Sequence, residues 1–324
     1  MFESEFTSKW RLNDNLLYLI IYINIYKIKI KYFNFFSFLY LKNFRFTIKE
    51  MTIIFKCKSS EAYIIKILAE LLSNNIKTGA FEINETGIYL CMMDSKRSIL
   101  IDLQLKAENF SIYKFNTKKL FIGLNLNHLH KMVKSVKKKD SIELFIDDKS
   151  PNDLAIRVIP KENNRITTSY IKIQNVQNLE IDIPKTVSKP IIVSSSDYQK
   201  LVKEMSNIGT IMKVTSKNFR IEFSCNAGGI LKRTVSFGEN DDEGDEEDDG
   251  VDEFSEEFIT EQLCRITKLS GLSNNMQIYP GKPLLFKTRV GGLGTLGIYI
   301  KSKAMIEEEN FNTLDSDGGF DSDA

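Results

Sequence analysis

The sequence predicts an α+β fold made of two similar units in tandem, and three observations support this prediction. From Met51 onward, helical and strand-like segments occur twice in the same order. Matching segments of the two halves lie about 134 residues apart throughout, which indicates internal duplication. Basic residues gather on the helical segments, whereas two acid-rich stretches lie outside the repeated pattern.

The first half is predicted to contain two helices and seven strands. The helix at 60–74 has apolar residues at helical spacing, including Ile64, Leu68 and Leu71, after a serine that favours a helix start. The helix at 125–138 follows the same spacing. The strands show alternating or continuous apolar residues and are expected at 79–84, 87–93, 98–106, 111–115, 141–147, 153–160 and 166–174.

The second half repeats this order. Helices are predicted at 195–207, after a Ser/Asp start, and at 261–269. Strands are predicted at 211–216, 219–225, 228–237, 275–279, 283–290 and 295–301.

These elements define the expected domain organisation: a first domain at 51–174, an extended interdomain connector at 175–190 and a second domain at 191–306. An acidic insertion at 239–257 and an acidic tail at 307–324 are expected to be solvated segments without a core.

Residues 1–50 are expected to lie outside this fold. Their apolar run at 15–41 is broken by Lys27, Lys29 and Lys31, so no charge-free stretch of membrane-spanning length exists. No small-residue cleavage site of a signal peptide follows the run. A membrane or partner anchor is the alternative interpretation.

The net charge of +1 conceals a strongly basic body. The insertion holds 13 acids and the tail 7, and neither contains Lys or Arg. Without these segments and residues 1–50, the remaining body carries about +17, which favours a polyanionic partner. Only nine of the bases are Arg, so phosphate contact is favoured over bidentate base recognition. An AT-rich genome also explains a lysine bias.

The basic residues lie on the predicted helices. Lys131, Lys134 and Lys138 occupy one face of the second helix, and no acid occurs between Asn125 and Lys139. An ordinary solvated face mixes acids with bases, so this face indicates contact with the backbone of duplex nucleic acid. Few aromatic residues accompany these lysines, so stacking on single strands is not indicated.

No pattern of catalytic residues is found, so the protein is not expected to be an enzyme or to need a cofactor. The GxGxxG match at 292–297 precedes a strand and not a helix, which disfavours a nucleotide site. His128 and His130 are two residues apart and point to different sides of a helix, which disfavours a metal site. The four cysteines form no CxxC pair and are expected to be reduced.

Three segments resemble the proliferating cell nuclear antigen family, the eukaryotic-type DNA sliding clamps. They are LCMMDSKRSILIDLQLKAENFSIYKF (90–115), GLNLNHLHKMVKSVKKKDSIELF (123–145) and SSSDYQKLVKEMSNIGT (194–210). The ending LGIYIKSKAMIEEE is similar to the family's last strand and acidic tail, and the resemblance covers 51–309.

The resemblance implies a DNA-clamp fold in which two domains per chain and three chains form a head-to-tail ring. Antiparallel sheets would lie outside and helices would line the hole. The free edges would be the strands near 170–174 and 229–235. The DNA-facing residues implied by position are Lys66, Lys131, Lys134, Lys200, Lys203 and Lys268.

The resemblance also implies a pocket under the connector that binds short partner peptides with apolar and aromatic anchors. The matching residues are Met93, Leu100, Leu179, Ile181, Ile183, Pro283 and Tyr299. Ordinary core packing is the alternative role for each. The family's small-residue–proline pair is replaced by Lys301–Ser302 here, and Ser98 replaces a valine-like residue, so the peptide preference is expected to differ.

The function expected from this resemblance is that of a homotrimeric processivity factor for replication and repair proteins. Its partners would be double-stranded DNA, a DNA polymerase, a clamp loader and clamp-binding peptides. The alternative is a checkpoint or accessory subunit that acts as a scaffold in a heterotrimer. The AT-rich bias suits an AT-rich eukaryote or a large DNA virus, so the expected location is the nucleus or a site of viral DNA replication, and not a secreted one.

Overall fold

The first half of the chain contains two helices that lie among nine strands. A computed structural model describes residues 53–162, 165–177, 180–185, 188–217, 219–238 and 254–317. The helices are α2 (Ala62–Asn75) and α3 (Leu126–Val133). The strands are β1 (Ile53–Ser59), β2 (Thr78–Asn84), β3 (Gly87–Met93), β4 (Ile99–Lys106), β5 (Ile112–Phe115), β6 (Leu120–Asn125), β7 (Ser141–Asp147), β8 (Ser150–Ile159) and β9 (Thr167–Lys172), with a 3-10 turn η1 (Ala107–Asn109) between β4 and β5.

The second half contains the equivalent helices and a C-terminal helix. The helices are α4 (Ser195–Met205), α5 (Thr260–Arg265) with the 3-10 turn η2 (Thr267–Gly271), and α6 (Lys303–Asp317). The strands are β10 (Ile191–Ser194), β11 (Ile211–Lys217), β12 (Arg220–Ala227), β13 (Leu231–Phe237), β14 (Phe254–Ile259), β15 (Asn275–Tyr279), β16 (Leu284–Val290) and β17 (Gly294–Ile300).

Strand pairing repeats in the two halves. In the first half, β1-β7-β8-β9 and β6-β2-β3-β4 are hydrogen-bonded in these orders. In the second half, the equivalent strands pair as β10-β15-β16-β17 and β14-β11-β12-β13. Each chain therefore contains one pattern of pairing twice, as the constant spacing in the sequence predicts.

One pairing between the halves joins them into a single eight-stranded sheet. Strand β17 pairs antiparallel with β4, with Gly294 opposite Leu105 and Ile300 opposite Ile99. The sheet order is β10-β15-β16-β17-β4-β3-β2-β6, so four strands come from each half. The last strand of the fold thus completes the sheet of the first half.

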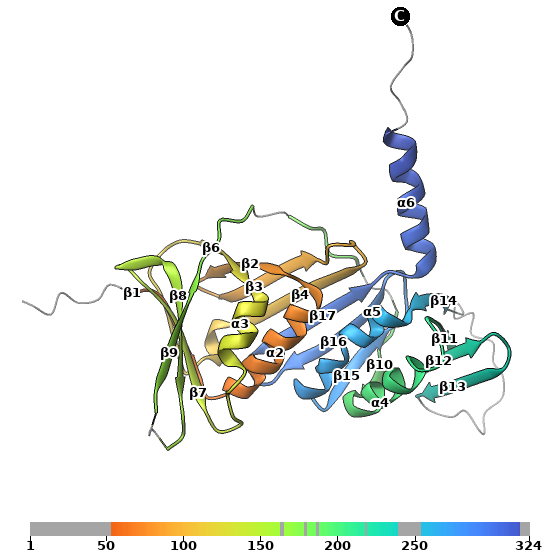
Figure 1. Ribbon diagram of the computed structural model, residues 1–324, viewed down its shortest axis with the longest axis horizontal. Helices are drawn as coiled ribbons and strands as arrows, with labels where there is room; N and C mark the ends of the chain where they lie inside the picture. The colour runs from red at the N-terminus through yellow and green to blue at the C-terminus, as the bar shows by residue number, and fades with distance from the viewer. Residues whose placement is uncertain are drawn as a thin grey trace, which may run out of the picture. The chain divides into compact units, whose positions relative to one another are not determined.

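The helices cover one face of the strands because their apolar sides face the core. Along α2, buried residues recur at Ala62, Ile65, Leu68 and Leu72, which is the spacing of one helical face. The helices α3, α2, α5 and α4 follow one another across the strands in Figure 1. The main hydrophobic core lies between this helical layer and the sheets.

Polar side chains fix where the helices begin and end. Ser59 Oγ accepts a hydrogen bond from the amide of Glu61 at 2.9 Å, just before α2. Asn125 caps α3 by accepting from the amide of His128 at 3.0 Å, which is the usual role of an N-cap asparagine. The Asn75 side chain donates to the Leu71 carbonyl at the end of α2.

Several sequence-based boundaries were wrong. Helix α3 ends at Val133 and not at Lys138, because Asp140 closes a turn in which it accepts from the Lys137 amide at 2.9 Å. The predicted single helix at 261–269 is divided into α5 and η2. The acidic insertion was assigned up to 257, but its last four residues, 254–257, belong to strand β14.

The remaining acidic residues divide between described and undescribed parts of the chain. Residues 307–317 of the predicted tail belong to helix α6, whereas 318–324 lie outside the described residues. Residues 1–52 and 239–253 also lie outside them. The division into the domains 51–174 and 191–306 stays a prediction, since the chain from Ile53 onward forms one compact unit.

Side-chain contacts add to the joint between the halves. Glu61, beside α2, accepts from the Gly292 amide at 2.9 Å. Asp94, buried after β3, accepts from the amide of Ser98 at 2.8 Å and lies 3.4 Å from an Arg265 guanidinium nitrogen. The first contact joins the start of α2 to the turn between β16 and β17, and the second joins the end of β3 to α5.

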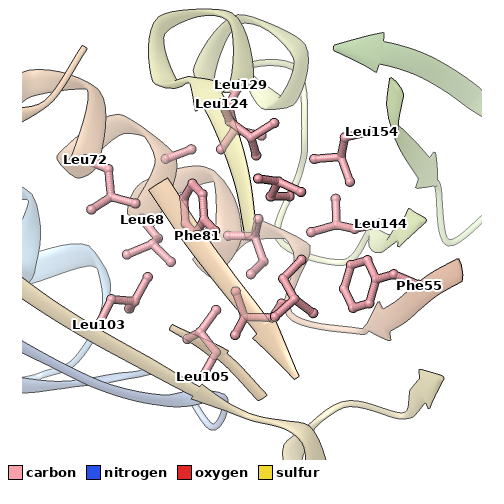
Figure 2. A pocket seen from close by; sticks show the side chains of 15 residues that line it. Phe55, Leu68, Leu72, Phe81, Leu103, Leu105, Leu124, Leu129, Leu144 and Leu154 are labelled. Carbon is pink, nitrogen blue, oxygen red and sulfur yellow. The ribbon is translucent and has the colours of Figure 1, made fainter. Parts of the chain in front are cut away.

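The core of the first half contains an apolar cavity of about 60 Å³ (Figure 2). Side chains from α2, α3 and seven surrounding strands face it, among them Leu68, Leu72, Phe81, Leu103 and Leu124. A cavity with an apolar lining stays dry and leaves its surrounding atoms without contacts on one side. This core is therefore already packed below its maximum density.

A Leu68→Ala substitution is expected to enlarge this cavity and to lower the free energy of unfolding by about 3–5 kcal/mol. Helix α2 and the sheet cannot approach each other to fill the added space, because the surrounding core fixes the distance between them. Urea denaturation measures this loss, with the exposed residue Met132→Ala as the matched control. A loss below about 1 kcal/mol would contradict the rigid cavity.

Candidate nucleic-acid interface

The four helices form one continuous layer. Helix α2 packs against α3 and η2, and α4 packs against η2 and α5. Figure 1 shows these helices on the same side of the strands. Side chains that point away from the core on all four helices therefore share one surface, here called the helical face.

Three of the six predicted DNA-facing lysines are free on the helical face. Lys131 lies on α3, Lys134 is its C-terminal cap, and Lys203 lies on α4. All three are exposed, and none has an ion-pair partner among the described residues. Their ammonium groups are available to neutralise phosphates.

The other three lysines are engaged in contacts within the chain. Lys66 donates to the Val136 carbonyl at 3.2 Å. Lys268 lies 2.7 Å from a Glu70 oxygen, and Lys200 lies 3.0 Å from Asp197. The hydrogen bond from Lys200 holds the pKa of the Asp197 carboxyl below its usual value. These lysines contribute charge to the helical face, but two of them are partly neutralised.

Every acid within the four helices is paired with a base. Besides the two pairs above, Glu204 bonds to Arg233 of β13 and Glu261 bonds to Arg265 at 2.6 Å. Pairing cancels the negative charge that would repel a phosphate backbone. The free lysines therefore set the sign of the helical face, which is positive.

The opposite face of the eight-stranded sheet carries a second, smaller apolar cluster. A row of residues directly opposite one another crosses five strands and runs Met93, Leu100, Tyr299, Leu285, Tyr279. Leu100, Tyr299 and Leu285 are buried, and Ile181 of the connector packs on them. This apolar row is separate from the main core, because the strands lie between them.

The structure brings together four of the seven predicted peptide-pocket residues: Met93, Leu100, Ile181 and Tyr299. Ile183 is 43% exposed and Pro283 is half-buried, and neither belongs to the cluster. Leu179 lies outside the described residues.

Sequence reasoning missed three members of the cluster: Cys91, Tyr279 and Leu285. Their alternation with core residues along each strand is visible in the sequence, but only the strand register shows that they adjoin Tyr299. Burial raises the pKa of the Cys91 thiol to about 11, with a further contribution from the charge of Asp102. Cys91 is therefore a neutral member of the cluster and lies beside the row.

Six strands lie at the edges of the three described sheets, and two of these edge strands, β9 and β13, correspond to strands that pair within the chain. Strand β9 pairs only with β8, and β13 pairs only with β12, among the described residues. Exposed apolar side chains lie at both edges: Tyr170 is 63% exposed and Leu231 52% exposed. By the internal repeat, β9 is the equivalent of β17 and β13 is the equivalent of β4, the two strands that pair within the chain. The edges of β9 and β13 are thus equivalent to the edges of β17 and β4, which pair with each other and join the two halves.

Comparisons with known proteins agree with this geometry. Residues 54–182 match the family model described as proliferating cell nuclear antigen, N-terminal domain. The proliferating cell nuclear antigen of Chaetomium thermophilum is 24% identical over 255 residues, which cover 76% of this chain and 97% of that protein. A probable DNA polymerase sliding clamp of Paramecium bursaria Chlorella virus 1 is 25% identical over 256 residues, which cover 76% and 96%.

A solved structure shows the same fold. The proliferating cell nuclear antigen of Entamoeba histolytica superimposes with a TM-score of 0.68 at 18% identity, over 78% of this chain and all of that one. In residues 54–182 the chain is similar to the proliferating cell nuclear antigen family, and it shares the fold of the solved family structure.

The match to the solved structure and to the family model confirms the predicted α+β DNA-clamp fold with duplicated units. The individual DNA-facing and peptide-pocket residues stay predictions. In the described part of the chain, no group of three or more His, Cys, Asp or Glu side chains is arranged to hold a metal ion. Nor does any helix there have the length and apolar character needed to cross a membrane.

Proposed function

We propose that this protein is a DNA sliding clamp, a ring that encircles duplex DNA and tethers a DNA polymerase to it. The observation that carries the proposal is the helical face, on which every helical acid is paired and Lys131, Lys134 and Lys203 are free. A positive surface without base-reading groups suits the phosphates of a duplex of any sequence. The relatives named as sliding clamps support this assignment.

Closure into a ring of three identical chains is the second part of the proposal. Strand β9 of one chain would pair with β13 of the next, as β17 pairs with β4 within a chain. Each chain offers one edge of each kind, which is the condition for a head-to-tail ring. The exposed side chains of Tyr170 and Leu231 would then be covered.

The mechanism requires contacts that hold DNA without fixing it. Lysine ammonium groups on flexible side chains bind phosphates as point charges and exchange between neighbouring phosphates. Long side chains such as Lys131 and Lys203 are therefore suited to sliding, and the closed ring prevents dissociation from the duplex. This function requires no chemical step and no cofactor.

The apolar row on the outer face is proposed to bind partner peptides. Leu100, Leu285 and Tyr299 form a floor, and Ile181 of the connector forms one side. A short segment with apolar and aromatic anchors fits such a surface. A polymerase and a clamp loader would carry such segments. The protein would act where DNA is replicated, in a nucleus or at a site of viral replication.

Primer extension on a circular template tests the proposal. Addition of the full chain and a clamp loader to a cognate polymerase should lengthen the products made in a single binding event. The same addition on a short linear template should have little effect, because a ring slides off free ends. Equal product lengths with and without the protein on circles would refute the proposal.

Sedimentation tests the three-chain ring against the alternative of a scaffold subunit in a heterotrimer. A homotrimer is expected from the two free edges of one chain. A stable single chain that forms a ring only with other proteins would favour the alternative.

An Ile181→Ala substitution should weaken binding of the polymerase by about 10-fold, since one apolar anchor contact is worth about 1–2 kcal/mol. Sedimentation and direct binding to a short duplex should be unchanged, because Ile181 lies on the connector and outside the main core. Fluorescence anisotropy with a labelled polymerase peptide measures the affinity. Ile192→Ala, 66% exposed on β10, is the matched control. Equal losses in both variants would contradict the assigned surface.

A further inference from the structure

The turn that follows α3 carries three consecutive exposed lysines, Lys137, Lys138 and Lys139. The turn has a fixed shape, because the buried Asp140 accepts from the Lys137 amide at 2.9 Å and donates its own amide to the Lys137 carbonyl at 3.1 Å. Three positive charges are therefore held on a short ordered segment.

One aromatic ring joins this turn to helix α2. The Lys138 Nζ lies 5.8 Å from the centroid of the Tyr63 ring, and the Lys66 Nζ lies 5.5 Å from it. Lys66 also donates to the Val136 carbonyl at 3.2 Å, in the segment that leads into the turn. Two ammonium groups from separate elements are thus placed against one ring.

The groups that hold these two ammonium groups are uncharged. An aromatic face attracts a cation and leaves its charge uncancelled, and the same is true of a carbonyl oxygen. Neither Lys66 nor Lys138 has an ion-pair partner among the described residues, in contrast with Lys200 and Lys268. Their combined charge is available to an anion.

The nearest charged groups do not alter this conclusion. Lys137 and Lys139 on the turn add positive charge. The Asp140 carboxylate is buried and is bonded to the Lys137 amide. The free residues Lys131 and Lys134 precede the turn on the same helix, so the two groups of lysines are continuous along the chain.

We propose that Tyr63 positions Lys66 and Lys138 as a paired phosphate-binding site, which the turn at 137–139 extends beyond the helices. The ligand is the phosphate backbone of duplex DNA. This inference rests on the proposed clamp function, since the site lies beside the free lysines of the helical face. Tyr63 is a positioning residue and Lys138 is a binding residue.

Salt-dependent DNA binding by the full chain tests the proposal. The logarithm of the association constant for a short duplex is plotted against the logarithm of salt concentration, and the slope counts the phosphate contacts. Lys138→Gln should reduce the slope by about 0.9 for each Lys138 side chain of the ring that contacts a phosphate. Lys118→Gln, which removes an exposed lysine between β5 and β6, should leave the slope unchanged.

Variants of Tyr63 separate positioning from a merely structural role. Tyr63→Phe keeps the aromatic face and should bind as the unaltered protein does. Tyr63→Leu keeps the volume but not the face, and it should reduce the slope nearly as much as Lys138→Gln. In a chain that already carries Lys138→Gln, Tyr63→Leu should reduce the slope by less than it does in the unaltered protein. Thermal unfolding and sedimentation show whether each variant is folded and assembled.

Three results would overturn the inference. The first is an unchanged slope in Lys138→Gln. The second is equal slopes in Tyr63→Leu and Tyr63→Phe. The third is a Lys138→Gln variant that binds DNA normally but no longer binds polyglutamate. That result would make an acidic protein, and not DNA, the ligand of the site. Failure of the clamp function itself gives a different result, namely no salt-dependent duplex binding and no gain in processivity with the unaltered protein.

Discussion

A Tyr170→Asp/Leu231→Asp double variant should sediment as a single chain, whereas the unaltered protein should sediment as three. Each proposed interface then contains a carboxylate from β9 and another from β13, and burial of two like charges is unfavourable. The expected loss is about 2–4 kcal/mol at each interface, or about 30- to 1000-fold in association. Processivity on circular templates should be lost with the ring.

The matched control for this experiment is Ile192→Asp. Ile192 is 66% exposed on β10, an edge strand that the proposed ring does not use. The control should remain a trimer. The fold of the double variant should persist, because both altered side chains are exposed in the single chain. A double variant that still sediments as three chains would exclude β9 and β13 as the interface.

A Lys131→Ala/Lys134→Ala/Lys203→Ala variant should bind duplex DNA with a much weaker dependence on salt. Each lost phosphate contact lowers the slope of log association constant against log salt by about 0.9, so loss of the three contacts of a single chain of the ring already lowers it by about 2.7. The affinity at low salt should fall together with loading efficiency. The three side chains are exposed and free of ion pairs with described residues, so trimer formation and thermal stability should be unchanged.

Charge removal from another surface provides the control for this variant. Lys118, Lys149 and Lys161 are exposed lysines outside the four helices. Their combined replacement by alanine removes the same charge from the chain. If both triple variants lose the same slope, the helical face has no special role and only the net charge matters.

Strands with clear alternation or tight turns were predicted from the sequence with their exact ends. The strands at 87–93, 141–147 and 275–279 are examples. Strands β1, β6, β10 and β14 were missed, the last two for identifiable reasons. β10 has only four residues, and β14 begins inside the acidic run, where charge hides the alternation of Phe254 and Phe258 with exposed residues.

The lysines of the helical face were predictable from the sequence where helix positions and charge are sufficient to place them. Helix positions and lysine spacing suffice to place Lys131 and Lys134 on one face. The pairing of Lys268 with Glu70 was not predictable, since the two residues are far apart in the sequence and meet only where α2 packs on η2. For the same reason, the position of Lys138 over Tyr63 required the structure.

The pairing of β17 with β4 has a consequence for synthesis of the chain. Strand β4 is made early, but its second neighbour is the last strand of the fold, about 190 residues later. Until β17 leaves the ribosome, the first half presents an unpaired strand edge, and such edges readily pair with other chains. The nascent protein therefore offers β4 to the β9 edge of a neighbouring molecule, the equivalent of β17. Mispairing with a neighbouring molecule and completion of the single chain therefore compete for the β4 edge during translation.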